Sequence, residues 1–245
     1  MKKVIVSITL ALTLFAAAGC ATHSRVELDP PLRFLLLGDS IMAGYFGYML
    51  EHRLREMPGV QVLRIGVKST GLSEFIRFDW HGKTLQYIKW YRPDVVVILF
   101  GGNDCYALRR PDGTLLLFTQ EGWRDEYAAR LDRYLDDITP MVKRVYLVGQ
   151  PSTNHPYFET RYPVLNKVFR AQSRKHAGVR YIPAWDMTSE KGLFVAVMKD
   201  GKGQTGAVKY PNDPIHHTPF GGRVLTERFL DYISDEFHPP AVITR

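Results

Sequence analysis

Residues 33–40 read RFLLLGDS, an apolar run that ends in Gly38, Asp39 and Ser40. A continuous run of this kind is typical of a parallel strand that is buried on both faces of a sheet. We therefore predict a central strand over 33–37. A serine hydroxyl placed directly after such a strand gains reach, and it becomes a nucleophile when a nearby base takes its proton.

Four further apolar runs have the character of buried strands, and helical patterns lie between them. The expected strands cover 33–37, 60–67, 94–100, 144–148 and 179–183, and the expected helices cover 41–57, 82–91, 123–139, 158–176 and 221–236. Strands that alternate with helices predict an α/β fold with a five-stranded parallel sheet and helices on both faces. Residues 186–212 form the longest stretch without a clear pattern, so we predict a lid there.

Polar motifs follow three of the expected strands. Ser40 follows the first, Gly71 comes soon after the second, and Asn103 lies in Gly101-Gly-Asn-Asp104 after the third. Ligands of such sheets gather at the carboxyl ends of the strands. We therefore expect these three residues to meet at one edge of the sheet.

A histidine near the end of the chain supplies the base that Ser40 would need. In Asp213-Pro-Ile-His216 the acid stands three residues before the ring, a spacing that brings the carboxylate beside the imidazole and can orient it. His217 is the alternative base, but adjacent residues face different ways, and we predict that His217 borders the cleft instead. The simpler alternatives are that Ser40 only caps a helix and that the histidine lies on the surface.

Ester hydrolysis passes through an oxyanion, which needs preorganised hydrogen-bond donors. The candidate donors are the N–H of Ser40, the N–H of Gly71 and the side-chain amide of Asn103, although Gly71 and Asn103 are also ordinary turn residues. We expect Asp104 to stabilise its loop, and Cys105 to be a buried free thiol rather than a nucleophile. No third ligand accompanies the two histidines, so we expect no metal.

Taken in order, Gly38-Asp39-Ser40, Gly71, Gly101-Gly-Asn103-Asp104 and Asp213-Pro-Ile-His216 resemble the four sequence blocks of the SGNH, or GDSL-type, hydrolases. The resemblance spans most of the chain. It implies a three-layer α/β/α flavodoxin-like fold and no organic cofactor or metal. It also implies a triad of Ser40, His216 and Asp213, with Gly71 and Asn103 joining the Ser40 N–H in the oxyanion hole.

Aromatic side chains near these motifs are candidates for stacking on sugar rings: Tyr45, Phe46, Tyr48, Trp80, Tyr106 and Trp123. We single out Trp80 and Trp123, together with His217, as possible substrate contacts. Core packing is the competing explanation for every one of the aromatic residues.

The beginning of the chain has the pattern of an export signal over 1–19, with two lysines, an apolar stretch and small residues before Cys20. Cys20 resembles the lipidated cysteine of a bacterial lipoprotein, and cleavage within Ala16–Ala18 is the alternative. We expect a lipidated tether over 20–32, a hydrolase domain over 33–238 and a tail over 239–245. The expected location is the outer membrane, facing the periplasm, with the lipid as membrane anchor.

The chain has 245 residues and a formal net charge of +7, which weakly favours anionic surfaces. Its Lys and Arg residues are scattered, so we expect no nucleic-acid partner. We predict a serine esterase that removes small acyl groups, most plausibly acetyl, from a cell-envelope glycan. An acyltransferase acting on an envelope polysaccharide and a non-catalytic glycan-binding lipoprotein are the alternatives.

Overall fold

The computed structural model describes residues 26–73 and 78–238. The expected export signal, Cys20 with the rest of 20–25 from the expected tether, and the expected tail therefore lie outside the described residues. The part of the tether that is described packs on the domain, because Leu28 is buried and pairs with Phe237 in an isolated parallel bridge. In the described part of the chain, no helix combines the length and the apolar character needed to cross a membrane.

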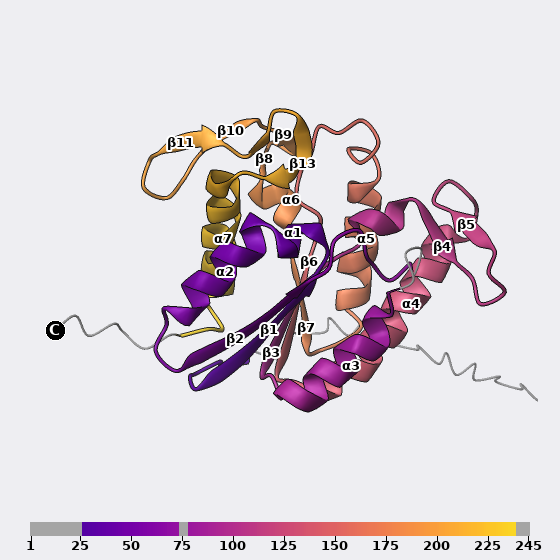
Figure 1. The fold of residues 1–245 in the computed structure, drawn as a ribbon, viewed down its shortest axis with the longest axis horizontal. Helices are drawn as coiled ribbons and strands as arrows, with labels where there is room; N and C mark the ends of the chain where they lie inside the picture. Colours follow the sequence, from indigo (N-terminus) through magenta and orange to yellow (C-terminus); the bar gives the residue numbers. More distant parts are fainter. Residues whose placement is uncertain (1–25, 74–77, 239–245) are drawn as a thin grey trace, which may run out of the picture.

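A five-stranded parallel sheet forms the centre of the molecule, in the order β2-β1-β3-β6-β7 (Figure 1). Its strands are β1 (Leu32–Gly38), β2 (Val60–Gly66), β3 (Val95–Leu99), β6 (Arg144–Val148) and β7 (Val179–Ile182). Every strand expected from an apolar run is present. β3 and β6 are buried along their whole length, as expected for strands covered on both faces.

Helices cover both faces of this sheet and give three layers (Figure 1). Helices α2 (Tyr45–Arg55) and α7 (Pro219–Ile233) pack together on one face, and α3 (Trp80–Tyr91), α4 (Trp123–Ile138) and α5 (Tyr162–Ser173) lie on the other. Shorter helical segments are α1 (Ser40–Ala43), α6 (Ala184–Met187), η1 (Gly102–Cys105) and η2 (Thr139–Met141). The architecture is the predicted α/β/α fold.

The helices expected over 82–91 and 221–236 each begin two residues earlier than expected, and two other expected helices differ more from the observed ones. The helix expected over 41–57 is broken at Gly44, whose backbone is extended, so that α1 ends there and α2 begins at Tyr45. The helix expected over 158–176 begins later, at Tyr162, with Pro163 in its first turn. Proline is favoured at that position, because its missing N–H would have no partner within the helix.

The stretch 186–212, expected to be an irregular lid, contains short antiparallel pairs instead. Strands β8 (Ser189–Glu190) and β9 (Leu193–Phe194) form one pair, and β10 (Val197–Lys199) and β11 (Thr205–Ala207) form another. A third pair joins β12 (Lys209–Tyr210) to β13 (Asp213–His217). Strands β4 (Ala107–Arg109) and β5 (Leu115–Leu117) form a similar hairpin after η1.

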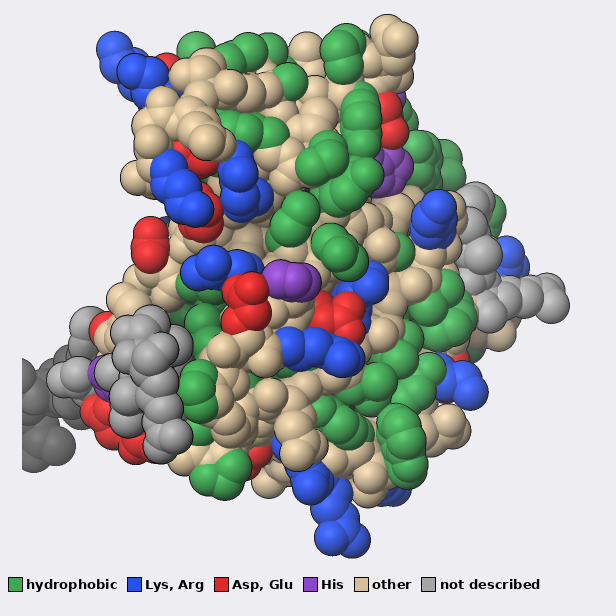
Figure 2. Space-filling model, turned by 60° about the vertical axis from the view of Figure 1, so that its left-hand side comes forward, with side chains coloured by type: hydrophobic (Ala, Val, Ile, Leu, Met, Phe, Trp, Pro, Cys, Tyr) green, Lys and Arg blue, Asp and Glu red, His purple; other side chains and the backbone are tan. Residues whose placement is uncertain are grey.

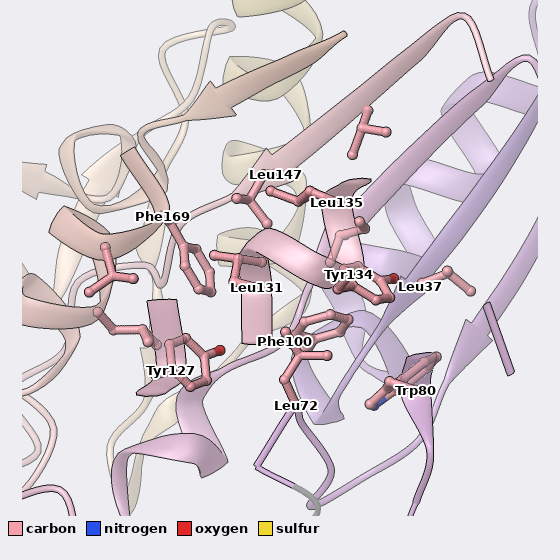
Figure 3. Packing of buried hydrophobic residues seen from close by; sticks show 14 of the residues in the cluster. Leu37, Leu72, Trp80, Phe100, Tyr127, Leu131, Tyr134, Leu135, Leu147 and Phe169 are labelled. Atoms are coloured by element: carbon pink, nitrogen blue, oxygen red, sulfur yellow. The ribbon is translucent and has the colours of Figure 1, made fainter. Parts of the chain in front are cut away.

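The core on the α3–α4–α5 side is rich in aromatic residues (Figure 3). Trp80 stacks on Phe100 with ring centres 5.6 Å apart, and Trp123 stacks on Tyr127 at 5.0 Å. Both tryptophans are 1% exposed. They help to hold the helices against the sheet directly below the edge where the polar motifs gather.

Candidate active site

The turn between β1 and α1 presents Ser40 at the carboxyl edge of the sheet. Gly38 is required there, because a Cβ atom would lie 2.2 Å from the carbonyl oxygen of Leu99. Asp39 is the N-cap of α1, and its Oδ1 accepts a hydrogen bond of 2.9 Å from the N–H of Ile41. The alternative in which Ser40 caps the helix is therefore wrong, and its hydroxyl is available for other contacts.

Ser40, His216 and Asp213 form one continuous hydrogen-bonded chain. Ser40 Oγ lies 2.8 Å from His216 Nε2, and His216 Nδ1 lies 2.6 Å from Asp213 Oδ2. An ionised carboxylate can only accept, so Nδ1 carries the ring proton and Nε2 accepts from the Ser40 hydroxyl. The spatial relation expected from the sequence is present across 176 residues of chain.

The acid of this chain is held by its own loop. Asp213 Oδ1 accepts hydrogen bonds of 3.1 Å from the N–H groups of Ile215 and His216. Burial raises the pKa of Asp213, but its hydrogen bonds with the ring and N–H of His216 and with Ile215 N–H outweigh burial and lower the pKa overall. The carboxylate is thus kept ionised beside the imidazole.

His217 takes no part in the hydrogen-bonded chain of Ser40, His216 and Asp213. It is 3% exposed, and neither ring nitrogen has a hydrogen-bond partner within the described residues. Burial lowers the pKa of His217 well below its usual range, with help from the nearby charges of Lys209 and His216. His217 does contribute to the wall of the pocket around Ser40, as expected from the sequence.

Asn103 lies in η1, at the end of β3, and lines the same pocket as Ser40. Its Nδ2 donates a 3.1 Å hydrogen bond to the carbonyl of Thr70, which joins two of the motif-bearing loops. The second amide hydrogen of Asn103 has no partner among the described residues.

Gly71 does not line this pocket. A Cβ atom on Gly71 would lie 2.1 Å from Asp104 Oδ1, so glycine is needed to let that buried carboxylate approach. Asp104 accepts hydrogen bonds from the N–H groups of Leu72 and Ser73 and from the hydroxyl of Tyr127. The close approach of Asp104 explains why residue 71 is a glycine, and Asp104 stabilises that loop as expected.

Ser69 takes the place in the pocket wall that was expected for Gly71. Its φ is +61°, in the left-handed region that residues other than glycine seldom adopt. Strained backbone of this kind gathers at functional sites. Ser69 was not singled out from the sequence, because the sequence does not show that a serine adopts a positive φ.

The pocket has a volume of about 500 Å³ and mixed walls. Trp80 and Trp123, expected as substrate contacts, belong to the buried core and do not reach it. The aromatic residues that do line the pocket are Tyr45, Tyr106, Phe158, Tyr162 and Tyr210. Of these, Tyr45, Tyr106 and Tyr210 are exposed.

Cys105 and possible metal ligands were also considered from the sequence. Cys105 is a buried free thiol, as expected, and burial raises its pKa well above the usual range, which disfavours the thiolate. In the described ranges no three His, Cys, Asp or Glu side chains come together in a way that could ligate a metal ion.

Several solved structures share this architecture. An α/β hydrolase called LAE5, from the metagenome of Lake Arreo in Spain, is 19% identical, with a TM-score of 0.58 over 83% of this chain and 95% of that one. A variant of Axe2, an acetyl-xylooligosaccharide esterase from Geobacillus stearothermophilus, is 19% identical, with a TM-score of 0.60 over 85% of this chain and 96% of that one. A catalytic mutant of the same Axe2, described as an acetylxylan esterase, is 18% identical, with a TM-score of 0.59 over 87% and 98% of the two chains.

A search of curated proteins found no match. A family model does match, over residues 33–232, and it is described as "Protein of unknown function (DUF459)". That span contains both Ser40 and His216 and, apart from Leu32 at the start of β1, all five strands of the sheet. The chain belongs to the DUF459 family, a family of SGNH-like hydrolases.

Proposed function

We propose that this protein is a serine esterase that removes small acyl groups such as acetyl from a carbohydrate of the cell envelope. The observation that carries the proposal is the unbroken chain from Ser40 Oγ through His216 to Asp213, with both contacts at 2.8 Å or less. A serine that only capped a helix would not need this alignment. The mechanism follows from the protonation states of Ser40, His216 and Asp213.

Ser40 Oγ attacks the ester carbonyl carbon as His216 Nε2 takes the hydroxyl proton. The imidazolium that forms is stabilised by Asp213, which remains ionised. Collapse of the tetrahedral intermediate breaks the bond to the alcohol oxygen, and His216 returns the proton to that oxygen. Water then attacks the acyl-enzyme by the same route and releases the carboxylic acid.

The oxyanion of each intermediate would be held by donors in the pocket wall. We assign the N–H of Ser40, the amide of Asn103 and, in place of Gly71, the N–H of Ser69 to this role. Each such donor typically contributes about 3 kcal/mol to stabilisation of the transition state. Because Asn103 is already anchored on Thr70, its amide needs little reorganisation during the reaction.

The aromatic side chains of the pocket support a sugar-bearing substrate. Tyr45 and Tyr106 are 38% and 43% exposed, and both line the pocket that holds Ser40. Tyr48 is 51% exposed in a smaller hollow of about 290 Å³ that shares Gly44 and Tyr45 with the first. Figure 2 shows hydrophobic side chains gathered beside a histidine in the upper right of one face. Such surfaces suit the apolar faces of sugar rings.

Envelope location is part of the same proposal. It is supported by the export pattern, by Cys20 and by the basic charge of the chain, all of which are features of sequence alone. A lipid on Cys20 would hold the domain at the outer membrane, where acylated glycans are within reach.

The proposal is tested by hydrolysis of p-nitrophenyl acetate, followed by acetate release from O-acetylated peptidoglycan and polysaccharides. Ser40→Ala should lower kcat by at least about 10³-fold. Equal rates for the wild type and this variant would refute the catalytic assignment. Transfer of the acyl group to a glycan acceptor without net hydrolysis would identify an acyltransferase instead.

A further inference from the structure

A buried lysine lies behind the acid–base loop. Lys209 on β12 is 4% exposed, and its Nζ donates a 2.6 Å hydrogen bond to the carbonyl of Ile215. Strands β12 and β13 pair through Lys209 and His217, and the register shifts between Lys209 and Tyr210. Lysine is almost never fully buried unless it has a partner, so its position here calls for an explanation.

The neighbouring carbonyl in the same loop is also held by a buried side chain. Thr153, in the loop that follows β6, is fully buried, and its Oγ1 donates a 2.7 Å hydrogen bond to the carbonyl of Pro214. Pro214 and Ile215 are the only two residues between Asp213 and His216. Both carbonyls of the link between the acid and the base are thus fixed, from two separate elements.

Two charged or titratable neighbours surround the Lys209 amine in this hairpin. Asp213 favours its charged form, and His217, the partner of Lys209 in the strand register, lies close enough for the two cationic forms to repel each other. Burial lowers the pKa of Lys209 to about 7, although Asp213 raises it. A neutral amine still carries hydrogens, so the hydrogen bond to Ile215 does not depend on the proton.

An apolar side chain would fill the space behind this loop at less cost in desolvation. The lysine is therefore better explained by the contact that it makes than by packing. We propose that Lys209 and Thr153 are positioning residues, which act on the reaction by holding the Asp213–His216 loop in register with Ser40. This inference rests on the proposed esterase activity. It predicts that removing the hydrogen bond to the carbonyl of Ile215 or of Pro214 disturbs the contacts of His216 with Asp213 and Ser40.

The test compares Lys209→Met and Thr153→Val with the wild type in hydrolysis of p-nitrophenyl acetate. Both substitutions keep side-chain volume and remove the donor. Lys199→Met, at an exposed lysine on β10, is the matched control. We expect kcat to fall about 10- to 100-fold in each of the two variants, with KM within about twofold, because small displacements of a catalytic group carry such costs. The control should keep its full rate.

A second readout does not depend on turnover. The proton on His216 Nδ1 should give a far-downfield NMR resonance, which His216→Ala would remove and so identify. We expect this resonance to shift or broaden in Lys209→Met and Thr153→Val and to stay unchanged in Lys199→Met. Folded variants with wild-type kcat and an unchanged resonance would overturn the positioning role.

Each failure has a distinct signature. A wild-type protein that hydrolyses no ester, but whose resonance moves in the two variants, would refute the esterase and leave the positioning intact. If Lys209→Met does not fold, Thr153→Val remains as the variant that removes a donor to this loop. Thr153→Val then decides the question, and wild-type behaviour of Thr153→Val would overturn the proposal.

Discussion

Replacing Lys209 by methionine should make the protein more stable near neutral pH while making it less active. The pKa of the buried amine is about 7, against an ordinary value of 10.5. Below pH 10.5 the unfolded chain holds a proton on this lysine. Folding at neutral pH must therefore either remove that proton or bury the charge.

The size of this effect follows from the two pKa values. They differ by about 3.5, and at about 1.4 kcal/mol for each pKa unit the buried lysine costs up to about 5 kcal/mol of stability at pH 7 and below. Loss of the hydrogen bond to Ile215 offsets about 1–3 kcal/mol of that cost in the variant. We therefore expect Lys209→Met to be more stable than the wild type by about 2–4 kcal/mol at pH 7.

The sign of the pH dependence is the sharper part of the prediction. Between pH 7 and pH 10.5 the unfolded wild type binds more protons at this residue than the folded protein does, so its stability rises with pH. The extra stability of the variant should therefore shrink steadily over this range. It should reverse near pH 10, where the cost of burying the amine falls below the contribution of the lost hydrogen bond.

Urea unfolding followed by tryptophan fluorescence, at intervals from pH 6 to pH 10, measures this difference. Other ionisable groups are the same in both proteins and largely cancel, and Lys199→Met controls for the loss of a lysine from the surface. A difference in stability that is equal at pH 7 and pH 10 would refute the reasoning, as would a variant that is less stable at pH 7.

Two further predictions concern residues of the pocket and its loops. His216→Ala should lower kcat for p-nitrophenyl acetate by at least about 10³-fold. His217→Ala should lower it by much less, because of the two histidines only His216 contacts Ser40. The reverse ranking would assign the base to His217. Gly71→Ala should lower the free energy of unfolding by about 1–3 kcal/mol, since its Cβ would lie 2.1 Å from Asp104 Oδ1. Thermal unfolding checks this, and an undiminished melting temperature together with a large loss of kcat would return Gly71 to the oxyanion hole.

The strands were predictable because their signal is local. A strand covered on both faces is apolar at nearly every position, and 95–99 shows this without reference to the rest of the chain. The exception in 144–148 is Arg144, which is buried and paired with Glu236. Helix starts were less predictable. The break at Gly44 depends on how α1 and α2 pack, and Gly47 in α2 is needed because a Cβ there would lie 1.9 Å from the carbonyl oxygen of Met42.

Two of the aromatic candidates for substrate contact, Trp80 and Trp123, lie in the core for a physical reason. A tryptophan that lines a pocket and one that fills a core look alike in sequence, and packing placed Trp80 and Trp123 in the core. The exposed Tyr210 was missed, because it lies in a stretch whose hairpins have little periodic signal. Ser69 was missed because φ is not visible in a residue name.

The order of apolar runs and polar motifs along the chain determined the α/β class, the parallel sheet and the identity of Ser40, Asp213 and His216. These depend on patterns within short segments, where each residue type reports directly on burial or chemistry. Only the tertiary structure decided which neighbours surround Ser40 and His216: Ser69 rather than Gly71 in the lining of the pocket, Tyr45 and Tyr106 rather than the two tryptophans among the aromatic candidates, and Lys209 and Thr153 behind the loop. Those contacts join segments far apart in the chain, and their distances follow from how the sheet and its helices pack, which no local pattern encodes.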